Sequence, residues 1–234
     1  MTNQIISFNT ILNELKQVPL EVWGRYAIER DILYKKVKPE EYDQLIYEAD
    51  QCGILYAKKI IEETKSKDPF QIADKLGINV TMGDSKPGSK RIVFATFTTP
   101  NNVILMQTPI LKTVQFVTNI EDIDHSDFTN QKIKEVLLSH ELFHYIENKY
   151  KKEIYTQTKK ITLWKLFGYE HKSNLRVLSE IAAMAFARTL GDIKYSPYMY
   201  DVIMYYPYDK AGASRIFNHI MKIKNEYEKG DLNV

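Results

Sequence analysis

Residues 134–147, KEVLLSHELFHYIE, contain an H-E-x-x-H pattern inside a stretch with helical periodicity. The pattern consists of His140, Glu141 and His144. Apolar residues fall on the same helical stripe as the two histidines: Ile133, Val136 and Leu137. The spacing therefore predicts a helix whose buried face the histidines continue.

Side chains four residues apart on a helix share a face, with Cβ atoms about 5–6 Å apart. At that spacing, His140 and His144 can bind one Zn²⁺. Glu141 is rotated by about 100° from His140, which favours a general base acting on a water over a third ligand. The alternative is a surface helix with two solvated histidines. The apolar stripe favours the metal, because buried imidazoles beside a carboxylate need partners.

A catalytic zinc normally takes three protein ligands, and residues 173–191, SNLRVLSEIAAMAFARTLG, offer the third. Ser173 or Asn174 as N-cap and Gly191 at the end predict a helix here. The residues around Glu180 are almost all apolar, and a buried lone carboxylate is costly unless paired. We expect Glu180 to be a zinc ligand. The alternative is a buried salt bridge with a lysine or arginine.

Other polar residues are weaker candidates for the site. Glu170 and His171 fall in a Gly-Tyr-Glu-His sequence that is expected to form an exposed turn. Glu147, one helical turn beyond His144, is expected to support the site or lie on the surface. His125 and His219 occupy ordinary positions. Tyrosines between 195 and 208 are too many to single out one as an oxyanion donor.

The chain as a whole predicts an α+β, mainly helical fold with a small antiparallel sheet of about three strands. Helical patterns are expected over 3–17, 20–36 and after Pro39, and Asp68-Pro69 starts a short helix that ends at Gly77. Strands are expected at 78–82, 92–98 and 103–106, with a polar loop at 83–88. Helix is expected from Asn130 onward, apart from residues 195–208. We divide the chain into a helical N-terminal region, 1–67, and a metal-binding domain, 68–234, and we expect the two to form one compact unit.

The composition excludes several classes of function. Thirty-two basic and thirty acidic residues give 234 residues a net charge of +2, which gives no support to a nucleic-acid or membrane partner. The single cysteine, Cys52, excludes a disulfide scaffold, so the metal site must use nitrogen and oxygen. The N-terminus lacks the apolar run of a signal peptide, and the longest apolar run, 181–187, is too short for a bilayer. A cytoplasmic protein is expected.

H-E-x-x-H together with E-x-x-A-x-x-F-A resembles the ImmA/IrrE family of zinc metallo-endopeptidases. The second motif consists of Glu180, Ala183, Phe186 and Ala187. The resemblance runs from about Asp68 to Leu190, and its lead-in is DPFQIADKLGINV followed by a hairpin. It implies a zincin-like metallopeptidase fold, with one Zn²⁺ on His140, His144 and Glu180, and Glu141 as general base.

Family members are mostly cytosolic proteins of bacteria or mobile elements, and several cleave a helix-turn-helix transcriptional repressor. The resemblance thus implies a protein substrate, held as an added strand on residues 92–98 or 103–106. The sequence departs from related patterns at three places. Tyr150 replaces a metzincin histidine, Met184 replaces the aspartate of thermolysin-like enzymes, and residues 111–128 read as an insertion.

Two readings from other classes stay open. A catalytically silent zinc fold could serve as an interaction or sensor module, since every required residue could be present beside a blocked cleft. A DNA-binding regulator would read PFQIADKLGINV as part of a helix-turn-helix. Against that reading, Ile78 onward alternates like a strand and no basic recognition helix follows.

Overall fold

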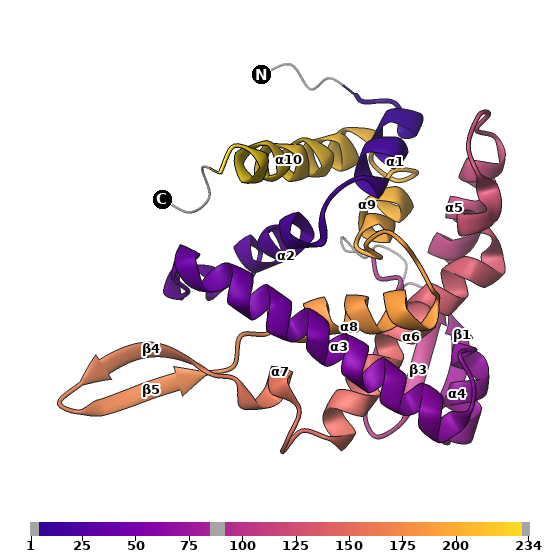
Figure 1. The fold of residues 1–234 in the computed structure, drawn as a ribbon. Helices are drawn as coiled ribbons and strands as arrows, with labels where there is room; N and C mark the ends of the chain where they lie inside the picture. Colours follow the sequence, from indigo (N-terminus) through magenta and orange to yellow (C-terminus); the bar gives the residue numbers. More distant parts are fainter. Residues whose placement is uncertain (1–4, 85–91, 231–234) are drawn as a thin grey trace.

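The structure is a computed structural model that describes residues 5–84 and 92–230. It is mainly helical with two small sheets, so the predicted α+β class is confirmed (Figure 1). In chain order the elements are α1 (Phe8–Lys16), α2 (Leu20–Glu29), η1 (Tyr34–Lys36), η2 (Pro39–Glu41), α3 (Tyr42–Thr64), α4 (Pro69–Lys75), β1 (Asn79–Gly83), β2 (Ala95–Thr98), β3 (Asn102–Met106), α5 (Gln107–Thr118), η3 (His125–Phe128), α6 (Asn130–Lys149), α7 (Tyr155–Thr158), β4 (Ile161–Leu166), β5 (Tyr169–Ser173), α8 (Val177–Leu190), α9 (Met199–Tyr205) and α10 (Lys210–Glu228). Among these, no helix has the length and apolarity needed to cross a bilayer.

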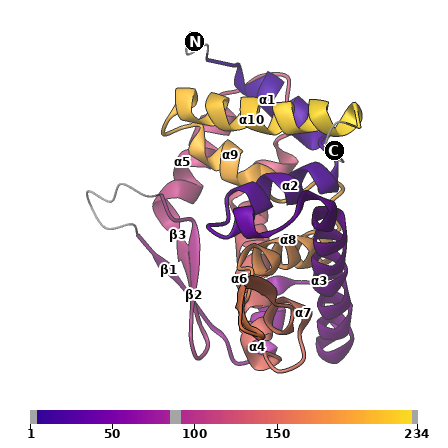
Figure 2. The same ribbon diagram turned by 90° about the vertical axis from the view of Figure 1, so that its left-hand side faces the viewer.

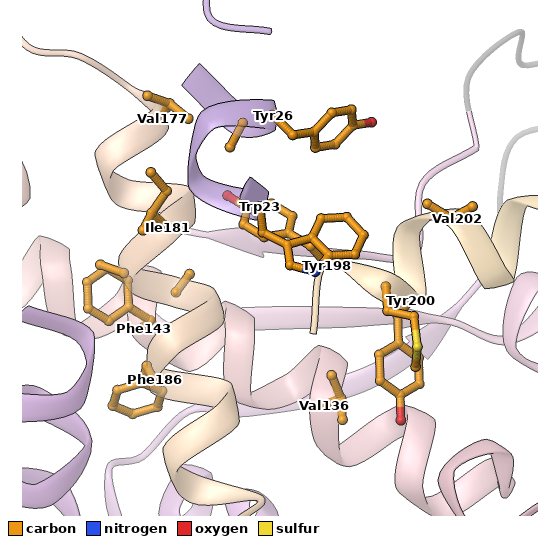
Figure 3. Close-up of a cluster of buried hydrophobic side chains, with 14 of the residues drawn as sticks. Trp23, Tyr26, Val136, Phe143, Val177, Ile181, Phe186, Tyr198, Tyr200 and Val202 are labelled. Atoms are coloured by element: carbon orange, nitrogen blue, oxygen red, sulfur yellow. The ribbon is translucent and has the colours of Figure 1, made fainter. Parts of the chain in front are cut away.

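Helix α8 lies at the centre and packs against both α3 and α6 (Figures 1 and 2). Phe143 of α6 meets Phe186 of α8 with ring centroids 5.8 Å apart (Figure 3). On the other side of the same core, Trp23 of α2 stacks on Tyr198 at 6.0 Å. One hydrophobic core thus extends from α1 to α10 and includes the N-terminal helices.

The contact between α3 and α8 depends on Gly53. A Cβ at this position would lie 2.1 Å from the carbonyl oxygen of Ala182 and 2.8 Å from Cβ of Ala185. The backbone of α8 cannot give way as a flexible side chain could. The absence of a side chain at residue 53 therefore lets the two helices approach closely.

We expect Gly53→Ala to destabilise the fold by about 2 kcal/mol, because the cost of overpacking exceeds the gain of about 1 kcal/mol in helix propensity. Urea denaturation measures the change. Gln51→Ala, at an exposed position of the same helix, is the control and should change stability by less than about 0.5 kcal/mol. A Gly53→Ala variant as stable as wild type would contradict the close-approach argument.

The three-stranded sheet has the order β1-β3-β2. The predicted hairpin is confirmed, since β2 pairs antiparallel with β3. The expected all-antiparallel sheet is wrong in one pair, because β1 runs parallel to β3. The chain enters β2 at the far edge and returns through β3, which therefore lies in the middle and runs in the same direction as β1. The expected polar loop at 83–88 lies mostly outside the described residues.

A second sheet, formed by β4 and β5, was not predicted. The two strands pair antiparallel around Phe167 and Gly168, with a register shift between Thr162 and Trp164 that breaks the alternation of the sequence. Figure 1 shows this hairpin extending away from the helices. Glu170 and His171 therefore lie on a strand, and not in the turn that the sequence suggested.

Several helix boundaries differ from the predictions. α1 begins at Phe8, capped by Ser7, and α2 ends at Glu29 rather than near Lys36. The stretch 195–208, which was expected to interrupt the helical pattern, contains α9. The region 111–128, which was read as an insertion, includes most of α5. The start at Asp68-Pro69 is confirmed, with the Asp68 side chain accepting from Phe70 N at 2.8 Å.

The start of α8 is a correction with a tertiary cause. Neither Ser173 nor Asn174 caps the helix, because Ser173 belongs to β5 and Asn174 donates to Gln157 O. Helix α8 begins at Val177, whose N–H donates to Asp31 Oδ2 at 3.0 Å. A carboxylate 146 residues away thus satisfies a donor at the start of the helix that carries Glu180.

Candidate metal centre

His140 and His144 come together on one face of α6 as the spacing predicts. Their rings lie 4.8 Å apart between centroids, and their Nε2 atoms are 3.1 Å apart. Neither ring is fully buried, since the side chains of His140 and His144 are 15% and 20% exposed. The expected burial is therefore only partial.

Glu180 of α8 reaches both histidines. Its Oε2 lies 3.3 Å from His140 Nε2, and its Oε1 lies 3.9 Å from His144 Nε2. One ligand atom from each of the three residues lies within 4.8 Å of the others. Two ligands of a tetrahedral zinc, each about 2.0–2.1 Å from the ion, are about 3.3 Å apart. The three side chains are thus spaced for one metal ion.

The environment of Glu180 differs from the sequence argument. Its side chain is half exposed rather than buried within an apolar helix. Within residues 5–84 and 92–230, its carboxylate lies within ion-pair distance of His140 and His144 but of no lysine or arginine. The alternative of a buried salt bridge is therefore not what the structure shows.

Glu180 opens into a pocket of about 500 Å³, called here the Glu180 pocket. Its walls come from α2 and the turn after it, from the start of α8, and from the segment leading into α9. The main lining residues are Tyr26, Arg30, Asp31, Arg176, Tyr198 and Asp201. Several of these residues belong to the N-terminal region. No local sequence pattern indicated that this region contributes to the site.

The imidazole of His144 is oriented by a small polar cluster. Its Nδ1 lies 3.3 Å from Ser179 Oγ and 3.8 Å from Glu147 Oε2. Glu147 accepts from Ser179 Oγ at 2.8 Å and also from Thr156 Oγ1. Burial raises the pKa of Glu147, but these hydrogen bonds outweigh it and hold the pKa below its usual range. The cluster holds His144 with Nε2 directed to the site.

Glu147 therefore supports the site, one of the two roles that the sequence left open for it. Ser179 and Thr156 were missed. The only sequence feature that pointed to Ser179 was its position directly before Glu180. His140 has no equivalent support, since its enclosed Nδ1 has no hydrogen-bond partner in the described part of the chain. Asp201 is a further missed residue, whose charge acts on His140 from α9.

Glu141 lies on α6 next to His140 and is 8% exposed. Its charge is one of those that raise the pKa of His140, which places it in the electrostatic field of the site. No hydrogen bond or ion pair to its carboxylate occurs among the residues that the structure describes. Buried carboxylates are usually paired, so the unpaired carboxylate of Glu141 is available to a ligand or a water at the site.

The remaining candidates lie apart from the metal cluster. Glu170 pairs with Lys165 and Lys172 on the β4–β5 hairpin. The other histidines have their own partners: His125 contacts Ile120 O, His171 stacks on Trp164, and His219 pairs with Glu29. None of these residues joins the group of His140, His144 and Glu180.

The metal-free site holds a proton tightly. Burial lowers the pKa of His140, but the hydrogen bond to Glu180 and nearby negative charges raise it from 6.5 to about 9. Burial raises the pKa of Glu180, whereas its contact with His140 and the charges of His144 and Arg176 lower it to about 2. At neutral pH the pair is therefore an imidazolium and a carboxylate.

We expect zinc affinity to rise about tenfold per pH unit from pH 6.5 towards 9, because a ligating imidazole must first lose its proton. Over the same pH range, the free energy of unfolding of the metal-free chain should fall. A raised histidine pKa contributes stability that is complete below 6.5 and is lost as pH rises through about 9. Chelator competition and urea unfolding across this range test both, and pH-independent affinity would contradict the assignment.

No protein-family model, curated protein or solved structure matches the chain.

Proposed function

We propose that the chain is a zinc-dependent endopeptidase that hydrolyses peptide bonds of a protein substrate. The observation that carries the proposal is the group of His140, His144 and Glu180, whose donor atoms are spaced for one ion. Two imidazoles and one carboxylate form a donor set typical of catalytic zinc, which keeps a position open. The unpaired carboxylate of Glu141 beside this group supports hydrolysis over a purely structural role.

The chain's own residues divide the reaction between them. Zinc, when bound, supplies Lewis acidity that makes water acidic near neutral pH and polarises a carbonyl group. His140, His144 and Glu180 would hold the ion, and Ser179 and Glu147 fix the ring of His144. Glu141 takes the proton of the attacking water and delivers it to the nitrogen of the departing amine.

The sheet supports a protein substrate bound as an extended strand. β2 is an edge strand that packs near α6, where Phe97 meets Tyr145 at 6.2 Å. Its outer edge has no strand partner in the described ranges, so a substrate segment can add to it. β3, the other strand considered, is paired on both sides and is excluded from this role.

The resemblance to ImmA/IrrE peptidases favours a helix-turn-helix repressor as the substrate and the cytoplasm as the location. A DNA-binding role for this chain itself has less support. PFQIADKLGINV forms α4 followed by strand β1, and not two successive helices.

Zinc content and cleavage test the proposal together. Elemental analysis should give about one zinc per chain, and a peptide library or a co-expressed repressor should be cut. A chelator should stop the cleavage and added zinc should restore it. No zinc would contradict the proposal, and zinc without cleavage of either substrate would favour the silent module.

A further inference from the structure

The arginines that the structure describes divide into two groups. Three of those described form ion pairs with aspartates: Arg25 with Asp43, Arg188 with Asp50 and Arg215 with Asp209. Arg30 and Arg176 form no ion pair with any described residue, and both line the Glu180 pocket. These two guanidinium groups, which have no acidic partner among the residues described, thus line the same pocket as Glu180.

Arg30 is held in place without losing its charge. Its Nη1 donates to the hydroxyl of Tyr26 at 2.6 Å, and its guanidinium carbon lies 5.2 Å from the centre of that ring. Figure 3 shows Tyr26 on α2 close to Trp23 and Tyr198, which belong to the buried cluster under the pocket. Arg30 is therefore preorganised on a rigid helix end.

Arg176 directly precedes α8, four residues before Glu180. Arg176 and Glu180 line the same pocket, so Arg176 lies beside one of the proposed metal ligands. Both arginine side chains are exposed to the pocket. A ligand that extends from the metal position into this pocket would thus meet one arginine at the start of α8 and a second one just after α2.

None of the described carboxylates that line the pocket forms an ion pair with Arg30 or Arg176. Asp31 uses Oδ2 to accept from Val177 N and Oδ1 to accept from Leu33 N. Glu180 faces the two histidines. Asp201 lies beyond ion-pair distance of both Arg30 and Arg176, because no such pair occurs in residues 5–84 and 92–230.

A solvated arginine on a surface is ordinary, so neither residue alone indicates a ligand. Two features of the pair together do indicate a ligand. They are the only described arginines without an ion pair, and they converge on the pocket where a substrate would lie. The planar fork of a guanidinium matches a carboxylate in bidentate geometry.

We propose that the Glu180 pocket is a specificity subsite in which Arg30 and Arg176 bind a carboxylate of the substrate near the scissile bond. This inference rests on the proposed peptidase function and names its substrate class, a peptide with an acidic residue beside the cleavage site. A terminal carboxylate has the same chemistry, and blocked peptide ends distinguish the two sources.

Binding is measured first, without catalysis. Zinc-loaded Glu141→Gln is titrated with two fluorescein-labelled pools of acetylated, amidated hexapeptides. The pools are identical mixtures except that one fixed position is glutamate in the first and glutamine in the second. With Arg30 and Arg176 both present, the protein should bind the glutamate pool about tenfold or more tightly than the glutamine pool, because hydrogen bonds to charged groups are stronger than those to neutral groups.

Arg30→Met and Arg176→Met, each added to this background, should reduce the glutamate-to-glutamine ratio towards one. Arg176→Lys should recover part of it, because a lysine keeps the charge but not the fork. Arg215→Met, which removes an exposed arginine from α10, is the matched control and should leave the ratio unchanged. Circular dichroism checks that each variant is folded.

Cleavage-site profiling of the wild type on a proteome-derived peptide library gives the second readout. Aspartate or glutamate should be enriched at one position beside the cut, and Arg176→Glu should shift the enrichment to lysine or arginine. Equal binding of the two pools, or acidic enrichment unchanged in both methionine variants, would overturn the inference. If selective binding is lost in these variants but nothing is ever cut, the subsite stands and the peptidase function fails.

Discussion

Glu141→Gln is expected to bind zinc as the wild type does and to lose about 10³-fold or more in kcat/KM. The substitution keeps the shape of the side chain but removes its ability to take a proton. General base catalysis by a positioned side chain contributes about 10²–10⁴-fold. Glu141 is not among the three residues grouped at the metal position, so zinc content should not fall. Parallel elemental analysis and peptide cleavage measure both quantities.

The matched control for this prediction is Glu135→Gln on the same helix. Glu135 accepts from Gln131 Nε2 at 3.0 Å in a surface contact one turn apart, and its neutralisation should leave both zinc and kcat/KM unchanged. Comparable losses in the two variants would indicate a general effect of charge on α6. Full activity in Glu141→Gln would remove Glu141 from the mechanism and reopen the search for the base.

Local geometry explains which parts of the site were predictable. His140, Glu141 and His144 lie within a single helical turn, so their relative positions follow from the helix alone. Glu180 was predicted from the cost of a lone carboxylate, yet its side chain is half exposed beside the histidines. The structure brings Glu180 beside the two histidines as expected, but the burial argument behind the expectation was wrong.

The parts that were missed depend on contacts between distant segments. Asp31 caps α8 from 146 residues away, which no local capping pattern can show. The parallel direction of β1 depends on how the chain crosses the sheet. The β4–β5 hairpin was hidden because the register shift between Thr162 and Trp164 breaks the period of two. Each of these features is set by tertiary structure rather than by local propensity.

These contacts give the N-terminal region a place in the site. Asp31 fixes the start of the helix that carries Glu180, while Tyr26 and Arg30 line the Glu180 pocket. Gly53 lets α3 approach that same helix. The position of Glu180 is therefore set from two sides by residues before 68, so the division at residue 67 separates sequence patterns and not independent parts of the site.

Glu180→Ala is expected to weaken zinc binding by more than about 100-fold. Losing a partner that only orients a ligand typically costs about 10–100-fold, and Glu180 would be a direct ligand. Glu170→Ala is the matched control, because Glu170 was the other carboxylate considered and pairs with Lys172 at 2.9 Å on the hairpin. It should bind zinc as wild type does. Chelator competition measures both affinities.

A measurement without metal separates the ligand role from a general loss of structure. The contact with Glu180 is the main reason that the pKa of His140 rises to about 9 against the lowering effect of burial. In metal-free Glu180→Ala the pKa of His140 should therefore fall to its ordinary 6.5 or below, as followed by NMR of the imidazole protons. If the pKa falls and zinc affinity is unchanged, Glu180 neighbours His140 but is no ligand. If the pKa of His140 and the zinc affinity both fall in a folded variant, the carboxylate that stabilises the imidazolium of His140 in the metal-free chain is also a zinc ligand.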